Sequence, residues 1–197
     1  MKHRFLCKPR FLFSLVSLFL VACVGCYSLS GPNSYQRTGI DKSKIKKVAV
    51  FSFHNNTQAR EASRIVTEAF LAELFKKKTF KVEFPGNVRA FLVNERIVVR
   101  TGIDLQTMKL MAKRLGVDAV IIGEVDEYVG VDDTERHVTP LVSIRSRMVD
   151  SRSGKILWLA HHRRTGDHYR KVLDFGKVRS VAALTGKVVG EMIQSMP

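Results

Sequence analysis

The stretch Leu115-Gly116-Val117-Asp118-Ala119-Val120-Ile121-Ile122-Gly123-Glu124-Val125 decides the fold. Residues 117–125 are almost continuously apolar, which is typical of a central strand buried on both faces of a sheet. Apolar residues before this run recur at intervals of three, four and three and predict a helix with one buried face: Leu105, Met108, Ala112 and Leu115. Gly116 suits the left-handed end of that helix. A helix that leads into a buried strand indicates an α/β protein.

The same reasoning extends outward in both directions. Toward the N-terminus we expect strands at 45–53 and 80–84 and helices at 61–75 and 88–94, with a brief extended piece at 97–99. Toward the C-terminus, residues 141–150 alternate between apolar and polar side chains, and 155–163 returns after a turn at 151–154. A final helix is expected over 174–196, where Gly176, Gly186 and Gly190 suggest tight packing against the sheet. The order β-α-β-α-α-β-β-β-α predicts a single mixed sheet with helices packed against it.

The N-terminus reads as a lipoprotein signal. Basic residues precede an apolar run over 11–21, which at about 11 residues is too short to span a bilayer. Ala22 is small enough for a peptidase pocket and directly precedes Cys23, whose thiol would carry the lipid. We therefore predict a signal peptide over 1–22, cleaved after Ala22. Cleavage before Cys26 and an uncleaved anchor are the alternatives.

Residues 23–44 are rich in Ser, Gly and Asn and predict a flexible linker between the lipidated cysteine and a domain over 45–197. In enteric bacteria an Asp after the modified cysteine signals retention at the inner membrane. By resemblance to that rule, Val24 favours the outer membrane, with the domain facing the periplasm. With Cys7 removed and Cys23 lipidated, Cys26 has no partner for a disulfide within the chain.

The charge is strongly positive, at +15 for the whole chain. Without residues 1–22, 29 Lys and Arg face 18 Asp and Glu, a net charge of +11. Outside the cytoplasm this excess argues against nucleic acid and for anionic lipid headgroups or acidic envelope polymers. A basic surface with no dedicated partner is the alternative.

Three stretches carry a family resemblance. Residues 47–57 (Lys-Val-Ala-Val-Phe-Ser-Phe-His-Asn-Asn-Thr), 115–125 and 149–158 (Val-Asp-Ser-Arg-Ser-Gly-Lys-Ile-Leu-Trp) are similar to the CsgG/LpoB-like superfamily of bacterial envelope lipoproteins. The resemblance spans about residues 45–195. It implies a CsgG/LpoB-like fold and a role in assembly or regulation of an envelope complex, either as an activator of penicillin-binding proteins or as a curli-type secretion channel.

Membrane-inserting hairpins like those of the curli channel are not expected. A membrane-spanning strand needs about 9–11 residues with an apolar outward face. The candidate segments 126–140 and 161–172 are rich in charged residues and histidine, so neither could present such a face. A subunit of a ring-forming secretion complex without its own pore remains the alternative, and a homo-oligomer stays open.

No enzyme motif accompanies these features. The chain has no Gly-x-Ser-x-Gly, no Walker loop and no Gly-x-Gly-x-x-Gly. His137, His161, His162 and His168 are the candidates for a metal-dependent enzyme, but adjacent strand residues point to opposite faces and no acidic ligand pattern accompanies them. We predict no catalytic residue, no metal and no cofactor, and a protein partner in the envelope.

Arginines of the hairpin form the candidate partner surface. Arg145 and Arg147 lie two residues apart on one face of the expected strand, and Arg163 and Arg164 belong to the returning strand. An open face of this kind would dock acidic groups. A solvated face, or one partly covered by the final helix, is the alternative. Trp158 is expected to be a core residue.

Overall fold

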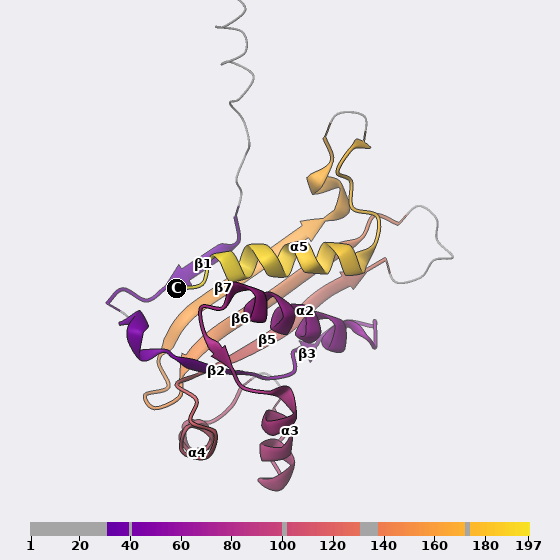
Figure 1. Ribbon diagram of the computed structural model, residues 1–197. Coiled ribbons are helices and arrows are strands. Elements are labelled where there is room, and N and C mark those ends of the chain that lie inside the picture. The colour runs from indigo at the N-terminus through magenta and orange to yellow at the C-terminus, as the bar shows by residue number, and fades with distance from the viewer. Residues whose placement is uncertain (1–30, 40, 100–101, 131–137, 172–173) are drawn as a thin grey trace, which may run out of the picture. The chain divides into compact units, whose positions relative to one another are not determined.

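The computed structural model describes residues 31–39, 41–99, 102–130, 138–171 and 174–197 (Figure 1). It confirms the predicted class, a single mixed sheet with helices packed against it. The sheet of the described residues has seven strands in the order β1-β7-β6-β5-β2-β4, with β3 paired to β5. The strands are β1 (Asn33–Gln36), β2 (Lys47–Val50), β3 (His54–Asn55), β4 (Lys81–Val82), β5 (Ala119–Val129), β6 (Leu141–Asp150) and β7 (Ile156–Thr165).

β5 is central, as its apolar sequence predicts. It pairs in parallel with β2, through Val48 opposite Ala119, and antiparallel with β6, through Val120 opposite Val149. Successive residues of β5 enter different cores: Ile121 is fully buried on one face, while Ile122 is buried on the other. The apolar run is continuous because both faces of this strand are covered.

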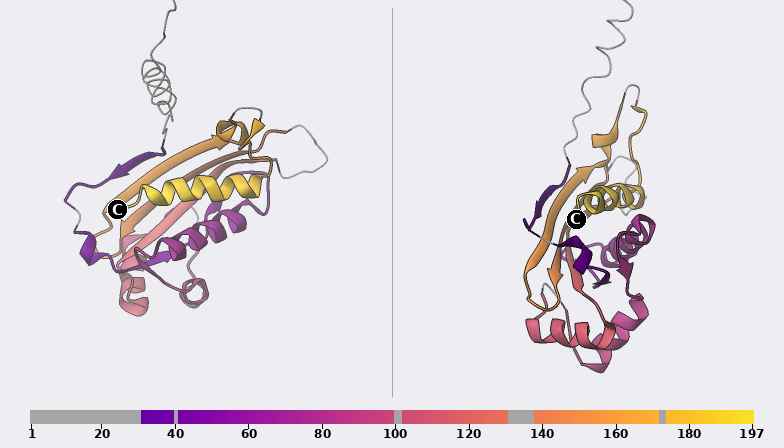
Figure 2. Two further views of the ribbon diagram at one scale, coloured as in Figure 1. Left: turned by 45° about the horizontal axis from the view of Figure 1, so that its top comes forward. Right: turned by 60° about the vertical axis from the view of Figure 1, so that its left-hand side comes forward.

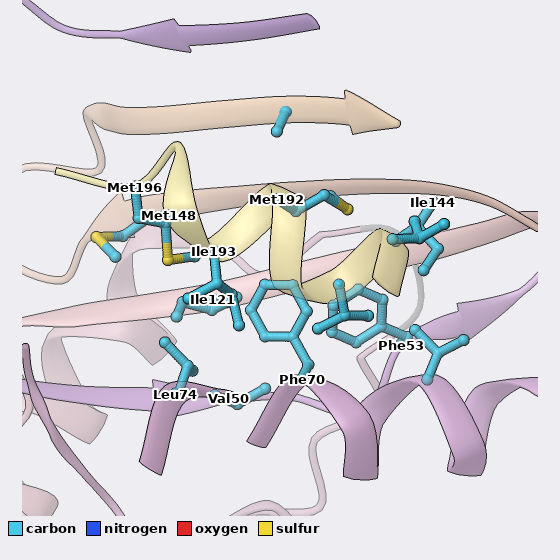
Figure 3. Close-up of a cluster of buried hydrophobic side chains, with 14 of the residues drawn as sticks. Val50, Phe53, Phe70, Leu74, Ile121, Ile144, Met148, Met192, Ile193 and Met196 are labelled. Atoms are coloured by element: carbon cyan, nitrogen blue, oxygen red, sulfur yellow. The ribbon is translucent and has the colours of Figure 1, made fainter. Parts of the chain in front are cut away.

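The helices divide between the two faces. α2 (Ala62–Lys77) and α5 (Val181–Gln194) lie side by side over one face, as both views of Figure 2 show. Their apolar stripes meet β5, β6 and β7 in the larger core, where Phe70 of α2 and Met192 of α5 are fully buried (Figure 3). α3 (Pro85–Asn94) and α4 (Leu105–Leu115) cover only one end of the opposite face. Among the described residues, no helix covers the rest of that face, on β6 and β7, which we call the open face.

β1 corrects the predicted domain boundary. Residues 33–36 were expected in the flexible linker, yet Asn33–Gln36 pairs antiparallel with β7, from Asn33 opposite His161 to Gln36 opposite Trp158. The compact unit accordingly begins at Gly31. All four side chains of β1 are exposed, so the strand has no apolar pattern that could have predicted it. A short helical turn, η1 (Lys42–Lys44), follows before β2.

The final helix is shorter than predicted. It begins after Ser180, whose hydroxyl accepts a hydrogen bond from the Ala183 N–H at 3.2 Å, and Gly176 lies before it in a left-handed conformation with φ of 82°. Tight packing against the sheet is wrong for the two glycines inside the helix: a Cβ on Gly186 would meet nothing within 4 Å, and one on Gly190 would meet only a Glu73 oxygen at 3.9 Å. Gly176, before the helix, is close to the Tyr169 carbonyl oxygen, 2.6 Å from where a Cβ would lie. Close approaches occur instead at Gly123 of β5, where a Cβ would lie 2.0 Å from the Phe53 ring, and at Gly166, where it would lie 2.0 Å from the Val178 carbonyl oxygen. A η2 turn (Gly166–Tyr169) follows β7, and 97–99 forms no strand.

No helix within the described ranges combines the length and apolar character needed to cross a membrane.

Candidate functional site

The candidate partner surface divides between the two faces of the sheet. Arg145 and Arg147 share one face of β6, as predicted, and Arg163 of β7 lies on that same face because it pairs with Ser143. Arg164, the next residue, points to the opposite face beneath α5, where its side chain is only 12% exposed. The prediction of one four-arginine surface is therefore wrong for Arg164, because adjacent strand residues alternate between faces.

Acidic side chains of β5 neutralise much of the open face. Arg145 donates from Nε and Nη2 to the two carboxylate oxygens of Asp126, both at 2.7 Å, and its Nη2 lies 3.3 Å from Glu124. Arg163 donates from Nε to Glu127 at 2.5 Å. These contacts raise the pKa of Arg145 and of Arg163 above the ordinary value, through hydrogen bonds to Asp126 and Glu127 respectively. The surface is an alternating array of charges rather than a purely cationic patch.

An irregularity in β5 makes this array. The pairing with β6 shifts between Val125 and Glu127, so that Asp126 is an extra residue in the strand. Because of the shift, Glu127 lies opposite Ser143, on the same face as Arg145, instead of on the other face. The sequence shows only acids at 124, 126 and 127, and nothing in this stretch marks the bulge in advance.

A shallow hollow lies at the centre of the open face. Ile122 and Glu124 of β5, Arg145 and Arg147 of β6, and Leu159 and His161 of β7 contribute to its lining. Two apolar side chains lie toward the β1 edge of the sheet: Leu159 of β7, which is 40% exposed, and Tyr35 of β1, which is 54% exposed. Tyr35 pairs with Leu159 across β1 and β7, so the two side chains lie on the same face. The surface thus offers an apolar strip beside oriented charges.

A second polar cluster lies beneath α5. Glu191 accepts hydrogen bonds from the Tyr169 hydroxyl at 2.7 Å and from Nε2 of His162, and the Arg164 Nε is 3.4 Å away. His162 is 2% exposed, and burial lowers its pKa below the ordinary value. Burial and the bond to Glu191 raise the pKa of Tyr169. These partners hold the pKa of Glu191 below its ordinary value despite burial. The cluster fixes α5 to β7.

The three candidate histidines that the structure describes lie apart from one another. His161 is on the open face, with Nε2 3.1 Å from the Ser143 hydroxyl, whereas His162 points beneath α5. His168 packs edge-on against Tyr169 at a centroid distance of 5.2 Å. Within the part of the chain that the structure describes, no three His, Cys, Asp or Glu side chains form a metal-binding group. His137 lies outside the described residues.

The lipidation prediction also falls outside them, since Ala22, Cys23 and Cys26 are not among the described residues. Trp158 is a core residue, as expected: it is fully buried, and its ring N–H donates to the Ser195 hydroxyl at 3.2 Å. The residues that sequence reasoning missed are Asp126, Glu127 and Glu191. Only the bulge and the docking of α5 bring them to the arginines.

Comparison with known proteins identifies relatives of this domain. A family model described as the peptidoglycan-synthase activator LpoB matches residues 27–163, more than half of the chain. None of the curated proteins compared with the chain matches it significantly.

Two solved structures are similar in fold. The PelC dodecamer from Paraburkholderia phytofirmans has a TM-score of 0.57 at 16% identity, over 84% of this chain and 97% of that one. The lipoprotein GNA1162 from Neisseria meningitidis has a TM-score of 0.52 at 18% identity, over 76% of this chain and 99% of that one. At these identities the likeness concerns the fold alone.

Proposed function

Because the chain belongs to the LpoB family of peptidoglycan-synthase activators, we propose that it is a non-catalytic lipoprotein that regulates a synthase complex of the cell envelope. The family match over residues 27–163 is the observation that carries this proposal. In this proposal Cys23 carries the lipid after cleavage at Ala22, and the domain faces the periplasm from the outer membrane. The resemblance to the curli-secretion channel stays a prediction.

The open face of the sheet is the surface we assign to the partner. Its apolar strip of Tyr35 and Leu159 can be removed from water, while Arg145 and Arg163, held by acids of β5, present donors in fixed positions. Tyrosine and arginine are enriched among the residues that contribute most to binding at protein interfaces. The face supports binding and gives no group a chemical step to perform.

The binding assay uses the mature lipoprotein in detergent and a purified peptidoglycan synthase from the same organism. We expect the lipoprotein to bind the synthase and raise its rate of glycan polymerisation. Tyr35→Ala with Leu159→Ala should weaken binding at least tenfold, about 1.4 kcal/mol. The matched control is Phe75→Ala with Phe175→Ala, which removes side chains 46% and 71% exposed, one on α2 over the opposite face and one in the segment before α5. Equal binding by the two double variants would count against the assigned face, and no effect on any synthase would count against the function.

The anchor has its own test. Cys23→Ala should block lipidation and signal cleavage and so leave a protein of precursor mass. A normal mature mass in that variant would contradict lipidation at Cys23. Cys26→Ala is the control, because it should be processed normally.

A homo-oligomer is the second candidate, favoured by the similarity to a protein that forms a dodecamer. We propose it as an alternative arrangement for the same anchored domain, in the manner of a ring-forming secretion component. Light scattering of the detergent-solubilised lipoprotein measures the mass of the assembly. A monomer would exclude this alternative without affecting the binding assay.

A further inference from the structure

One end of the sheet carries a concentration of exposed cations. This basic end is defined by six exposed residues: Lys46, Lys78, Lys81, Lys113, Arg152 and Lys155. It lies at the left of Figure 1, where α2 and α4 end, β2 and β4 begin, and the β6–β7 turn closes.

Hydrogen bonds between these segments show that they are neighbours. The Lys81 N–H donates to the Lys46 carbonyl at 2.8 Å, which places the starts of β4 and β2 together. Asp118 links the start of β2 to the β6–β7 turn: its Oδ2 accepts from the Lys46 N–H at 3.0 Å, and its Oδ1 lies 3.4 Å from Nη2 of Arg152. The end of α4 joins them where Nζ of Lys47 donates to the Leu115 carbonyl at 2.7 Å. The cations therefore form one continuous surface although they come from five segments of the chain.

The acids of this end are recessed and already occupied. Asp118 is 21% exposed, and Oδ2 of its carboxylate is shared by two backbone N–H groups. Glu83 is 5% exposed and pairs with Lys47. Asp150 accepts from N–H groups of its own turn, at Arg152 and Ser153. Exposed acids near this end are Asp41, which pairs with Lys44 at 3.6 Å, and Asp104, which caps α4. Apart from Asp41 and Asp104, the carboxylates of this end therefore lie behind the exposed lysine and arginine side chains.

The segment between Cys23 and the compact unit is long enough for the basic end to reach a membrane that holds the lipid. Gly31, where the compact unit begins, follows Cys23 by eight residues, a reach of at most about 29 Å. Asn33 pairs with His161, five positions beyond the first residue of β7, which is about 17 Å along the strand from the β6–β7 turn. Because the reach exceeds this distance, a lipid on Cys23 allows the basic end to touch the surface of the same bilayer.

We infer that the basic end is a membrane-docking surface for anionic phospholipid headgroups, which holds the domain with its strands directed away from the bilayer. This inference rests on the proposed lipidation at Cys23. The lipid supplies attachment, whereas the lysines supply orientation through headgroup phosphates. The open face of β6 and β7 then remains accessible to a partner beside the membrane.

The test uses the mature lipoprotein in vesicles, with Cys26→Ser and a single fluorophore attached at Thr79→Cys, between Lys78 and Lys81. A matched probe at Gln58→Cys reports the opposite end of the sheet. The vesicles contain a headgroup quencher, in phosphatidylcholine with or without phosphatidylglycerol. We expect phosphatidylglycerol to increase the quenching of the Thr79 probe and not that of the Gln58 probe. High salt should reverse this increase.

Charge variants identify the residues responsible. Lys81→Gln with Lys155→Gln should lower the ratio of docked to undocked protein about 25-fold, about fivefold per lysine. Arg60→Gln with Arg179→Gln removes the same charge from exposed residues at the other end and should leave the ratio unchanged. Unchanged Trp158 emission verifies that each variant is folded.

Several results would overturn the inference. These are equal quenching at both probes, equal quenching in both vesicle types, or equal effects of the two charge pairs. A Thr79 probe that responds to soluble dextran sulfate and not to anionic vesicles would show a surface for acidic polymers instead. Loss of the protein from vesicles after an alkaline wash is a different outcome, because it contradicts the lipid anchor of the proposed function rather than the basic end.

Discussion

Replacement of Glu191 by alanine measures what the buried polar cluster contributes to stability. Glu191 receives hydrogen bonds from Tyr169 and His162 and lies 3.4 Å from Arg164, whose side chain is 12% exposed. Without Glu191 the buried Arg164 charge would lose this carboxylate. Breaking a buried ion pair on one side costs about 3–5 kcal/mol.

The magnitude for this site falls at the lower end of that range. Glu191 is 29% exposed, so water can partly replace the carboxylate. We expect Glu191→Ala to lower the free energy of unfolding by about 3 kcal/mol and, for a domain of this size, the Tm by about 6–12 °C. Glu191→Gln should cost less, because an amide oxygen still accepts from Tyr169.

Urea unfolding followed by tryptophan emission measures this change. Trp158 is the chain's single tryptophan and is fully buried, so its emission reports loss of the core. Glu68→Ala is the matched control: Glu68 is a helix carboxylate that is 61% exposed and pairs with Arg64, and its loss should cost less than about 1 kcal/mol.

A double variant examines the cause. If the cost arises from losing the Glu191–Arg164 pair, Arg164→Met should restore part of the stability lost in Glu191→Ala, with a coupling of about 1–3 kcal/mol. A loss for Glu191→Ala no larger than that for Glu68→Ala would refute the reasoning. So would full additivity of the two substitutions, since it would show that Glu191 and Arg164 do not interact.

Two further predictions concern the core and pH. Gly123→Ala places a methyl group against the buried Phe53 ring and should lower the free energy of unfolding by about 1–3 kcal/mol. Gly186→Ala, with open space around its Cβ, should be neutral or stabilise α5 by about 0.5–1 kcal/mol. The urea midpoints of the two variants measure both effects. Burial lowers the pKa of His162 in the folded protein, so below the ordinary pKa of 6.5 the unfolded chain binds more protons than the folded one. The free energy of unfolding should therefore fall as the pH drops below 6.5. The urea midpoint measured from neutral to mildly acidic pH should show this fall, and an undiminished slope in His162→Gln would contradict it.

The open face shows where reasoning from the strands succeeded and where it ended. Arg145 and Arg147 share a face because strand side chains alternate, and the same alternation separates Arg163 from Arg164. The acids that pair with them could not be assigned from the sequence, because one extra residue at Asp126 reverses which side Glu127 faces. A cationic surface was the expectation, and the register shift made it a mixed one.

The sequence by itself determined the α/β class, the central place of β5 and the buried faces of the helices. These follow from hydrophobic periodicity, which is local and records how many faces of an element are covered. Only the tertiary structure decided that β1 belongs to the sheet, that Glu191 meets His162 and Arg164, and that lysines from separate segments gather at one end. An exposed edge strand, an ion pair across α5 and β7, and a surface built from five segments leave no periodic pattern. Their free energy comes from contacts between residues far apart in the chain.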